Sequence, residues 1–171
     1  DSGDYYGITN PEFMEEVERY ADWLEEQPDV SVVGSYVGML KSLNKAENGN
    51  DEAWHKLPED NLQVIDYLVS YQLVQEIEPH LSPIFDPEYT TVRITAGTSN
   101  LSNVQLLNLN RRIEAWYEEN LNPKYRVLHG NNSILYARLN DTISRQLLEG
   151  FTVSFLLITL TMLVGLRSLR Y

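Results

Sequence analysis

The chain has 171 residues, a formal net charge of −12 from 25 acidic and 13 basic residues, and no cysteine. Such an acidic balance repels phosphate backbones, so we expect no nucleic-acid partner. The absence of thiols excludes disulfides, zinc–thiolate sites and thiol catalysis. Aromatic residues are plentiful, with eleven Tyr, four Phe and three Trp, and they indicate a packed domain rather than a disordered chain.

The N-terminal part of the chain predicts a loop, a helix and a strand. Residues 1–9 are polar and glycine-containing, as in a loop. Asn10 and Pro11 are typical of the N-cap and first position of a helix, and Pro28 ends it. The apolar residues that fall on one face of this helix are Phe13, Met14, Val17, Tyr20, Ala21 and Leu24. The β-branched run at residues 30–36 predicts a strand.

Residues 37–88 are too long for a simple connection between strands, and we predict that they form a helical insertion. A helical turn is expected at residues 37–43. The main helix is expected from about Pro58 to Glu76. The residues expected to face inward on it are Leu62, Ile65, Leu68, Val69 and Leu73.

The second half of the chain predicts a strand at residues 90–96, a helix at 102–120 and a short strand at 125–128. If one further strand precedes Asp1, or is supplied in part by residues 4–8, the order becomes the split β-α-β motif. We therefore expect an α+β fold of the ferredoxin-like type, in which the three predicted strands share one sheet. This α+β domain is expected to occupy residues 1–140.

A helix that enters and spans a membrane is predicted over residues 141–171. The 17 residues 150–166 carry no charge, which is the lower limit for crossing the hydrocarbon core of a bilayer. The residues expected to face lipid include Phe151, Leu156, Leu160 and Leu166. Arg167 and Arg170 indicate a cytoplasmic C-terminal end. The alternative is a buried core helix of a soluble protein.

No catalytic, cofactor-binding or metal site is predicted. His55, His80 and His129 are far apart and lack the spacing of helical metal ligands. Adjacent glutamates such as Glu15 and Glu16 point about 100° apart on a helix, so they do not form a catalytic pair. Trp54, together with His55, lies in a loop-rich stretch and is the candidate contact surface.

Several short motifs resemble one family when taken in order. They are NGNDEAWHKLPED at residues 48–60, YLVSYQL at 67–73, the Asn-Pro-Glu-Phe helix start at 10–13, PDVSVVGS at 28–35, and the Leu-Arg-Ser-Leu-Arg exit of the apolar helix. This order resembles the second periplasmic loop of MMPL-type predicted exporters of the RND superfamily, together with the membrane helix that follows it. The resemblance covers essentially the whole chain.

The resemblance implies a proton-driven transporter of the bacterial inner membrane, with residues 1–140 in the periplasm. Its partners would be hydrophobic, amphipathic or lipid-like molecules, the membrane and other parts of the same transporter, and a homo-oligomer is open. It would not be an enzyme and would need no cofactor. The family's proton-relay residues lie in other helices, so none is assigned here. Two alternatives remain, an extracytoplasmic ligand-sensing domain of a membrane receptor and a tail-anchored enzyme.

Overall fold

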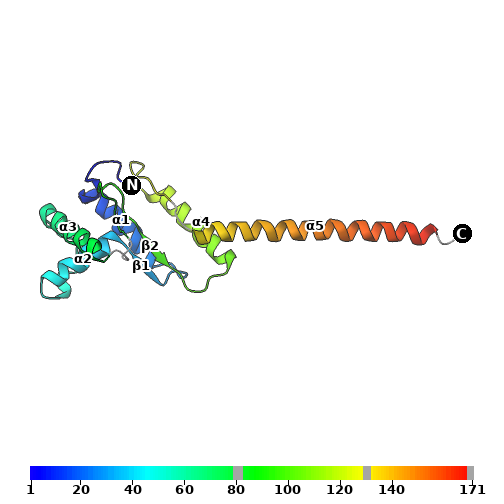
Figure 1. Ribbon diagram of the computed structural model, residues 1–171, viewed down its shortest axis with the longest axis horizontal. Coiled ribbons are helices and arrows are strands. Elements are labelled where there is room, and N and C mark those ends of the chain that lie inside the picture. Colours follow the sequence, from blue (N-terminus) through cyan, green and yellow to red (C-terminus); the bar gives the residue numbers. More distant parts are fainter. Residues whose placement is uncertain (79–82, 129–131, 169–171) are drawn as a thin grey trace. The chain divides into compact units, whose positions relative to one another are not determined.

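The computed structural model describes residues 1–78, 83–128 and 132–168. In chain order the described elements are η1 (Gly7–Thr9), α1 (Pro11–Glu25), β1 (Val32–Gly34), α2 (Tyr36–Glu47), η2 (Glu52–Trp54), α3 (Asn61–Ile77), β2 (Thr95–Gly97), α4 (Asn103–Asn120) and α5 (Asn132–Ser168) (Figure 1). The fold is mixed and rich in helix, with a small two-stranded sheet and one long apolar C-terminal helix.

The chain divides into two compact units. The first comprises Asp1–Asn100 and Arg112–His129, and the second comprises Leu101–Arg111 and Gly130–Tyr171. Helix α4 contributes residues to both units. The sheet and helices α1, α2 and α3 belong to the first unit, and α5 belongs to the second.

Helix α1 forms where the sequence predicts it. The Asn10 side chain accepts a hydrogen bond from the Glu12 backbone N–H at 2.9 Å, and Pro11 occupies the first turn, where its missing N–H costs nothing. The buried residues of α1 are Phe13, Met14, Val17, Ala21 and Leu24. This face is the one that the helical period of the apolar residues predicts.

Two of the expected strands form an antiparallel pair, but both are shorter than predicted. Val32 pairs with Gly97, and Gly34 pairs with Thr95. Strand β1 ends early because the Ser35 hydroxyl accepts a hydrogen bond from the Gly38 N–H at 3.0 Å and so starts α2 at Tyr36. The helical turn expected at residues 37–43 is therefore part of a longer helix.

The third expected strand, residues 125–128, is not a strand. Its Arg126 instead exchanges two backbone hydrogen bonds with Asp1: the Asp1 ammonium donates to the Arg126 carbonyl at 2.8 Å, and the Arg126 N–H donates to the Asp1 carbonyl at 3.1 Å. The exchange involves a single residue pair, too little to form a ladder. Among the described residues, the expected sheet of three strands is therefore wrong.

The core of the first unit joins η1, α1, α2 and α3. Its most buried side chains are Ile8, Tyr36, Val37, Leu40, Asn44, Val64 and Leu68. In α3 the buried face consists of Val64, Tyr67 and Leu68. Of the residues expected to face inward, Leu68 is buried and Ile65 is half-buried, whereas Leu62, Val69 and Leu73 are exposed. That expectation is thus wrong for three residues, because apolar side chains surround α3 and mark no single face.

The N-terminal segment is tied to the turn at residues 86–91. The Ser2 N–H and hydroxyl both donate to the Thr90 carbonyl at 2.8 Å, and the Ile8 N–H donates to the Tyr89 carbonyl at 3.2 Å. The Asp86 carboxylate organises this turn by accepting from the Thr90 N–H at 2.8 Å and the Thr91 N–H at 2.6 Å. The predicted loop at residues 1–9 is therefore an anchored segment.

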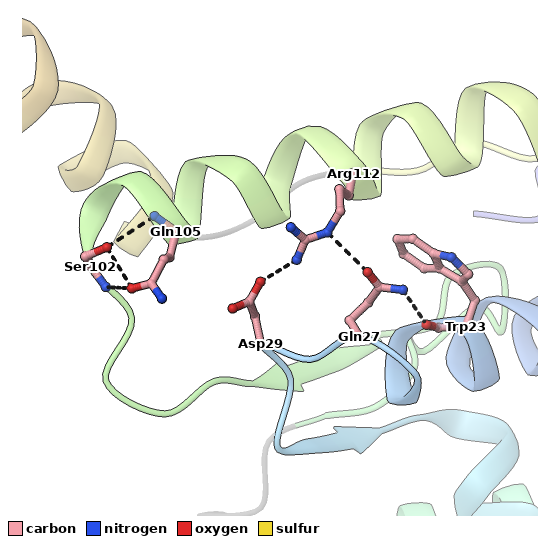
Figure 2. A network of polar contacts seen from close by, with 6 residues as sticks. All are labelled: Trp23, Gln27, Asp29, Ser102, Gln105 and Arg112. Atoms are coloured by element: carbon pink, nitrogen blue, oxygen red, sulfur yellow. Dashed lines mark hydrogen bonds and ion pairs between the residues drawn. The ribbon is translucent and has the colours of Figure 1, made fainter.

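The second unit contains the beginning of α4 and the whole of α5. The Ser102 N–H donates to the Gln105 side-chain oxygen at 3.0 Å, and the Gln105 N–H donates back to the Ser102 hydroxyl at 3.3 Å, which is a capping box at the start of α4 (Figure 2). Helix α5 runs without a break for 37 residues (Figure 1). Between residues 133 and 166 Ala137 is buried, Ile134 and Asp141 are half-buried, and every other side chain is exposed.

Candidate functional site

The candidate membrane helix lies within α5. Over Ser133–Leu166 this helix is long and apolar enough to cross a membrane, and its most apolar stretch has no buried side chain. All the residues expected to face lipid are exposed, namely Phe151, Leu156, Leu160 and Leu166. A core helix of a soluble protein would bury such side chains. This exposure favours association with a membrane.

The threonine side chains in the apolar stretch are satisfied within the helix. The hydroxyls of Thr152 and Thr159 each donate to the backbone carbonyl four residues earlier at 2.8 Å, and the Thr161 hydroxyl donates to the Ile158 carbonyl at 2.9 Å. An unpaired hydroxyl in hydrocarbon costs several kcal/mol. These internal hydrogen bonds remove that cost, so the threonines are compatible with a lipid environment.

The candidate contact residue Trp54 ends the short helix η2, and 43% of its surface is exposed. Two hydrogen bonds from a buried side chain fix its backbone. The Asn44 amide donates to the Trp54 carbonyl at 3.1 Å and to the Lys56 carbonyl at 2.9 Å. The Lys56 ammonium lies 5.5 Å from the centre of the indole ring. The loop therefore presents an exposed aromatic ring and a cation from a rigid backbone.

The histidines form no metal site that the structure describes. His55 is exposed and adjoins Trp54, whereas His80 and His129 lie outside the described residues. Within residues 1–78, 83–128 and 132–168, no group of three His, Cys, Asp or Glu side chains is placed to hold a metal ion. Trp54 and His55 are thus both exposed on this loop.

A polar network joins α4 to the end of α1 in the first unit (Figure 2). The Arg112 Nε donates to the Gln27 side-chain oxygen at 3.2 Å, and its guanidinium also pairs with the Asp29 carboxylate. Gln27 in turn donates to the Trp23 carbonyl at 3.1 Å. These contacts connect α4 to the end of α1 and to the segment that follows it, so we assign the network a structural role.

An aromatic stack lies next to this network and was not predicted as a unit. The rings of Tyr20 and Trp23 on α1 stack on Trp116 of α4, with ring centroids 5.0 and 5.2 Å from it. Burial, with the nearby Tyr117, raises the pKa of Tyr20 to about 12. The spacing of Tyr20 and Trp23 on one face of α1 is the sequence signal for half of the stack. Their partner lies almost a hundred residues away, where no local pattern points to it.

The described side chains thus provide three features: an apolar helix long enough to cross a membrane, an exposed aromatic loop and a polar network. Of these, the apolar helix has the clearest physical character. Comparisons with protein-family models, with curated proteins and with solved structures gave no match.

Proposed function

We propose that the chain is the periplasmic α+β domain and following membrane helix of a proton-driven exporter of the RND/MMPL type, which moves hydrophobic or lipid-like molecules. The observation that carries the proposal is α5, which exposes an apolar surface along its whole membrane-length stretch and continues unbroken to Asn132. The order of the sequence motifs is the support for the proposed family.

The unbroken helix supports a mechanical role for the domain. Between residues 132 and 168 no proline interrupts the backbone hydrogen bonds, so α5 has no built-in hinge. A movement at one end of such a helix is transmitted to the other end as a rigid-body shift. In this proposal the domain responds to rearrangements of neighbouring membrane helices and thereby opens or closes a path for apolar cargo.

The ferredoxin-like arrangement is part of the proposal. In chain order, strands β1 and β2 would be the second and third strands of that motif, which pair antiparallel, with the helical insertion between them. The two backbone hydrogen bonds that Asp1 and Arg126 exchange have the antiparallel pattern expected where the first and fourth strands of the motif meet. A strand leading into Asp1 would extend this exchange along residues 126–128.

The exposed loop around Trp54 would contact other parts of the transporter. Tryptophan side chains on rigid surfaces are frequent anchors of protein interfaces, and here the backbone of the ring is fixed by Asn44. The net charge of the chain argues that its partners are not anionic polymers.

Photolabelling with a photoreactive phospholipid tests the proposal in the intact protein in its native membrane. Label is expected on α5 around residues 132–148 and on its neighbours, because a lipid leaving the bilayer passes there. Imposing a proton gradient should increase efflux of a lipid-like fluorescent dye from vesicles made of that membrane. Label confined to the loop around Trp54, or ATP hydrolysis by the purified chain, would rule the exporter out. Efflux that ignores the gradient would favour a sensing domain.

A further inference from the structure

The part of α5 outside the apolar run is amphipathic, and its apolar side is exposed in the part of the second unit that the structure describes. The exposed apolar residues there are Leu135, Tyr136, Leu139, Ile143, Leu147 and Leu148. At 100° per residue all of them except Leu148 fall within an arc of about 120° on one side of the helix. The charged residues Arg138, Asp141, Arg145 and Glu149 lie on the other side. An exposed stripe of this kind marks an interaction surface.

The covered side of α5 lies away from this stripe. Ala137 is 1% exposed, and Ile134 and Asp141 are half-buried, so these residues mark the covered side of the helix. They lie roughly 120–180° around the helix from Ile143. The covered side is therefore separate from the stripe, which is exposed.

The stripe continues into the membrane with a heptad spacing. The seam, as we call these positions, consists of Tyr136, Leu139, Ile143, Gln146, Gly150, Val153, Leu157, Leu160 and Val164. The steps alternate between three and four residues, which is the pattern of a left-handed pair of helices. No seam residue is charged, and all of them are exposed.

We propose that the seam binds the seam of a second copy of this chain, in a parallel helix pair that starts outside the bilayer and continues through it. The membrane fixes the geometry, since two copies inserted in the same sense are parallel, and the apolar run of residues 150–166 sets both at the same depth. Each seam residue then meets its own equivalent. The inference rests on α5 crossing the membrane and does not rest on export.

Two seam residues favour a copy of the same helix over an unrelated partner. Gln146 carries both a donor and an acceptor, so its amide can hydrogen-bond to the Gln146 of the second copy. A single polar residue in an apolar seam fixes the register of such a pair. Gly150 follows at the start of the apolar run, where a Cβ-free position lets the two backbones approach closely.

The charged residues also permit self-pairing. Arg138, Asp141 and Arg145 all lie outside the seam and the positions that flank it. Arg145 and Asp141 already pair with each other along the helix at 3.1 Å. Glu149 flanks the seam, but in a parallel pair it would face Ser154 of the second copy rather than a like charge. Between residues 136 and 164, no like charges therefore face each other across the pair.

Disulfide trapping tests the pair in the full chain reconstituted into liposomes, because the chain has no cysteine of its own. Ile143→Cys and Leu139→Cys should form covalent dimers under mild oxidation. Ser144→Cys, one residue from the seam, should react at least roughly tenfold more slowly, since cysteines with Cα atoms beyond about 7 Å cannot be bridged. Equal trapping at Ser144, or no trapping at either seam position in the folded protein, would overturn the proposal.

A charge variant supplies a second test with its own control. Gln146→Glu places two carboxylates face to face, so sedimentation in detergent should show monomers at pH 7 and dimers again at about pH 4, where carboxylates begin to protonate. Gln146→Leu should remain dimeric at both values. A Gln146→Glu chain that stays dimeric at pH 7 would place the interface elsewhere. Neither test uses cargo, so the failure of the exporter proposal and of this one are told apart.

Discussion

Asp86 shows how one carboxylate holds a turn together. Its oxygens accept hydrogen bonds from the Thr90 and Thr91 N–H groups and from the Thr90 hydroxyl at 2.9 Å. Burial alone would raise the pKa of this carboxyl, but the hydrogen bonds from Thr91 and Thr90 together outweigh burial and lower its pKa. The backbone N–H groups of Ser2 and Ile8 donate hydrogen bonds to this turn and so fix the N-terminal segment to it.

This lowered pKa predicts a loss of stability in acid. A carboxyl whose pKa is lower in the folded state stabilises the fold above its ordinary pKa near 4, and that contribution disappears as the pH falls through the folded pKa. Urea unfolding of the full chain in detergent should show a smaller acid-induced loss for Asp86→Asn than for the unchanged chain. Asp66→Asn, an exposed position on α3, should behave like the unchanged chain. An identical acid response in Asp86→Asn would contradict the role assigned to this carboxylate.

Asn44 and Trp54 lie in contact around the same loop but contribute unequally to stability. Asn44→Ala should lower the free energy of unfolding by about 1–3 kcal/mol, because it leaves the Trp54 and Lys56 carbonyls without their buried donor. Trp54→Ala should lower it by less than about 1 kcal/mol, since it removes a largely exposed ring and one exposed cation–π contact.

Chemical denaturation of both variants checks this contrast in stability. Export measured in cells then tests whether Trp54 is a contact residue. If Trp54 is a contact residue, its alanine variant should reduce export while melting at nearly the same temperature as the unchanged chain. A large drop in the melting temperature of Trp54→Ala would instead make this tryptophan a core residue.

At the scale of elements, α3 offers a matched pair of leucines. Leu68 is buried, so Leu68→Ala should cost about 2–5 kcal/mol of unfolding free energy. Leu73 is exposed, and Leu73→Ala should cost less than about 1 kcal/mol. Equilibrium unfolding in urea measures both. Equal losses would mean that the face predicted from the sequence, which includes both residues, is the one that packs.

The same helix explains what the sequence can and cannot predict here. Helix α1 was predicted with its buried face because one side of it is charged, so the apolar period is unambiguous. The existence of α3 was predictable, but its orientation was not, because apolar residues occur all round it. Of the candidate site, the long apolar helix was predictable from a single charge-free run, whereas the exposure of Trp54 depends on how the chain folds.

The strands were the least predictable elements. Residues 30–36 include three valines, as a strand often does, yet Ser35 caps a helix and ends the strand after Gly34. Residues 125–128 resemble a strand in composition, but a strand needs a partner of similar length, and Arg126 pairs with Asp1 alone. Both differences arise from hydrogen-bond partners that composition does not reveal.

At the scale of the whole molecule, the two units predict a difference in solubility. Removing the residues after Asp141 should leave a soluble, folded domain, because the core around Tyr36 and Leu68 lies entirely in the first unit. The full chain should require detergent. Size-exclusion chromatography and circular dichroism check both statements. A truncated chain that unfolds, or a full chain that is monodisperse without detergent, would contradict the membrane placement of α5.

The length of α5 has a consequence for whatever reaches this domain from the bilayer. An α-helix rises about 1.5 Å per residue, so the stretch from Asn132 to Glu149 measures about 27 Å when it stands upright. The first residue of the helix is then held a distance comparable to the thickness of the hydrocarbon core above the point where α5 enters it. A lipid tail cannot follow that length of helix through water unprotected. Any apolar molecule that moves along α5 between the bilayer and Asn132 must therefore be shielded on the way by protein surface.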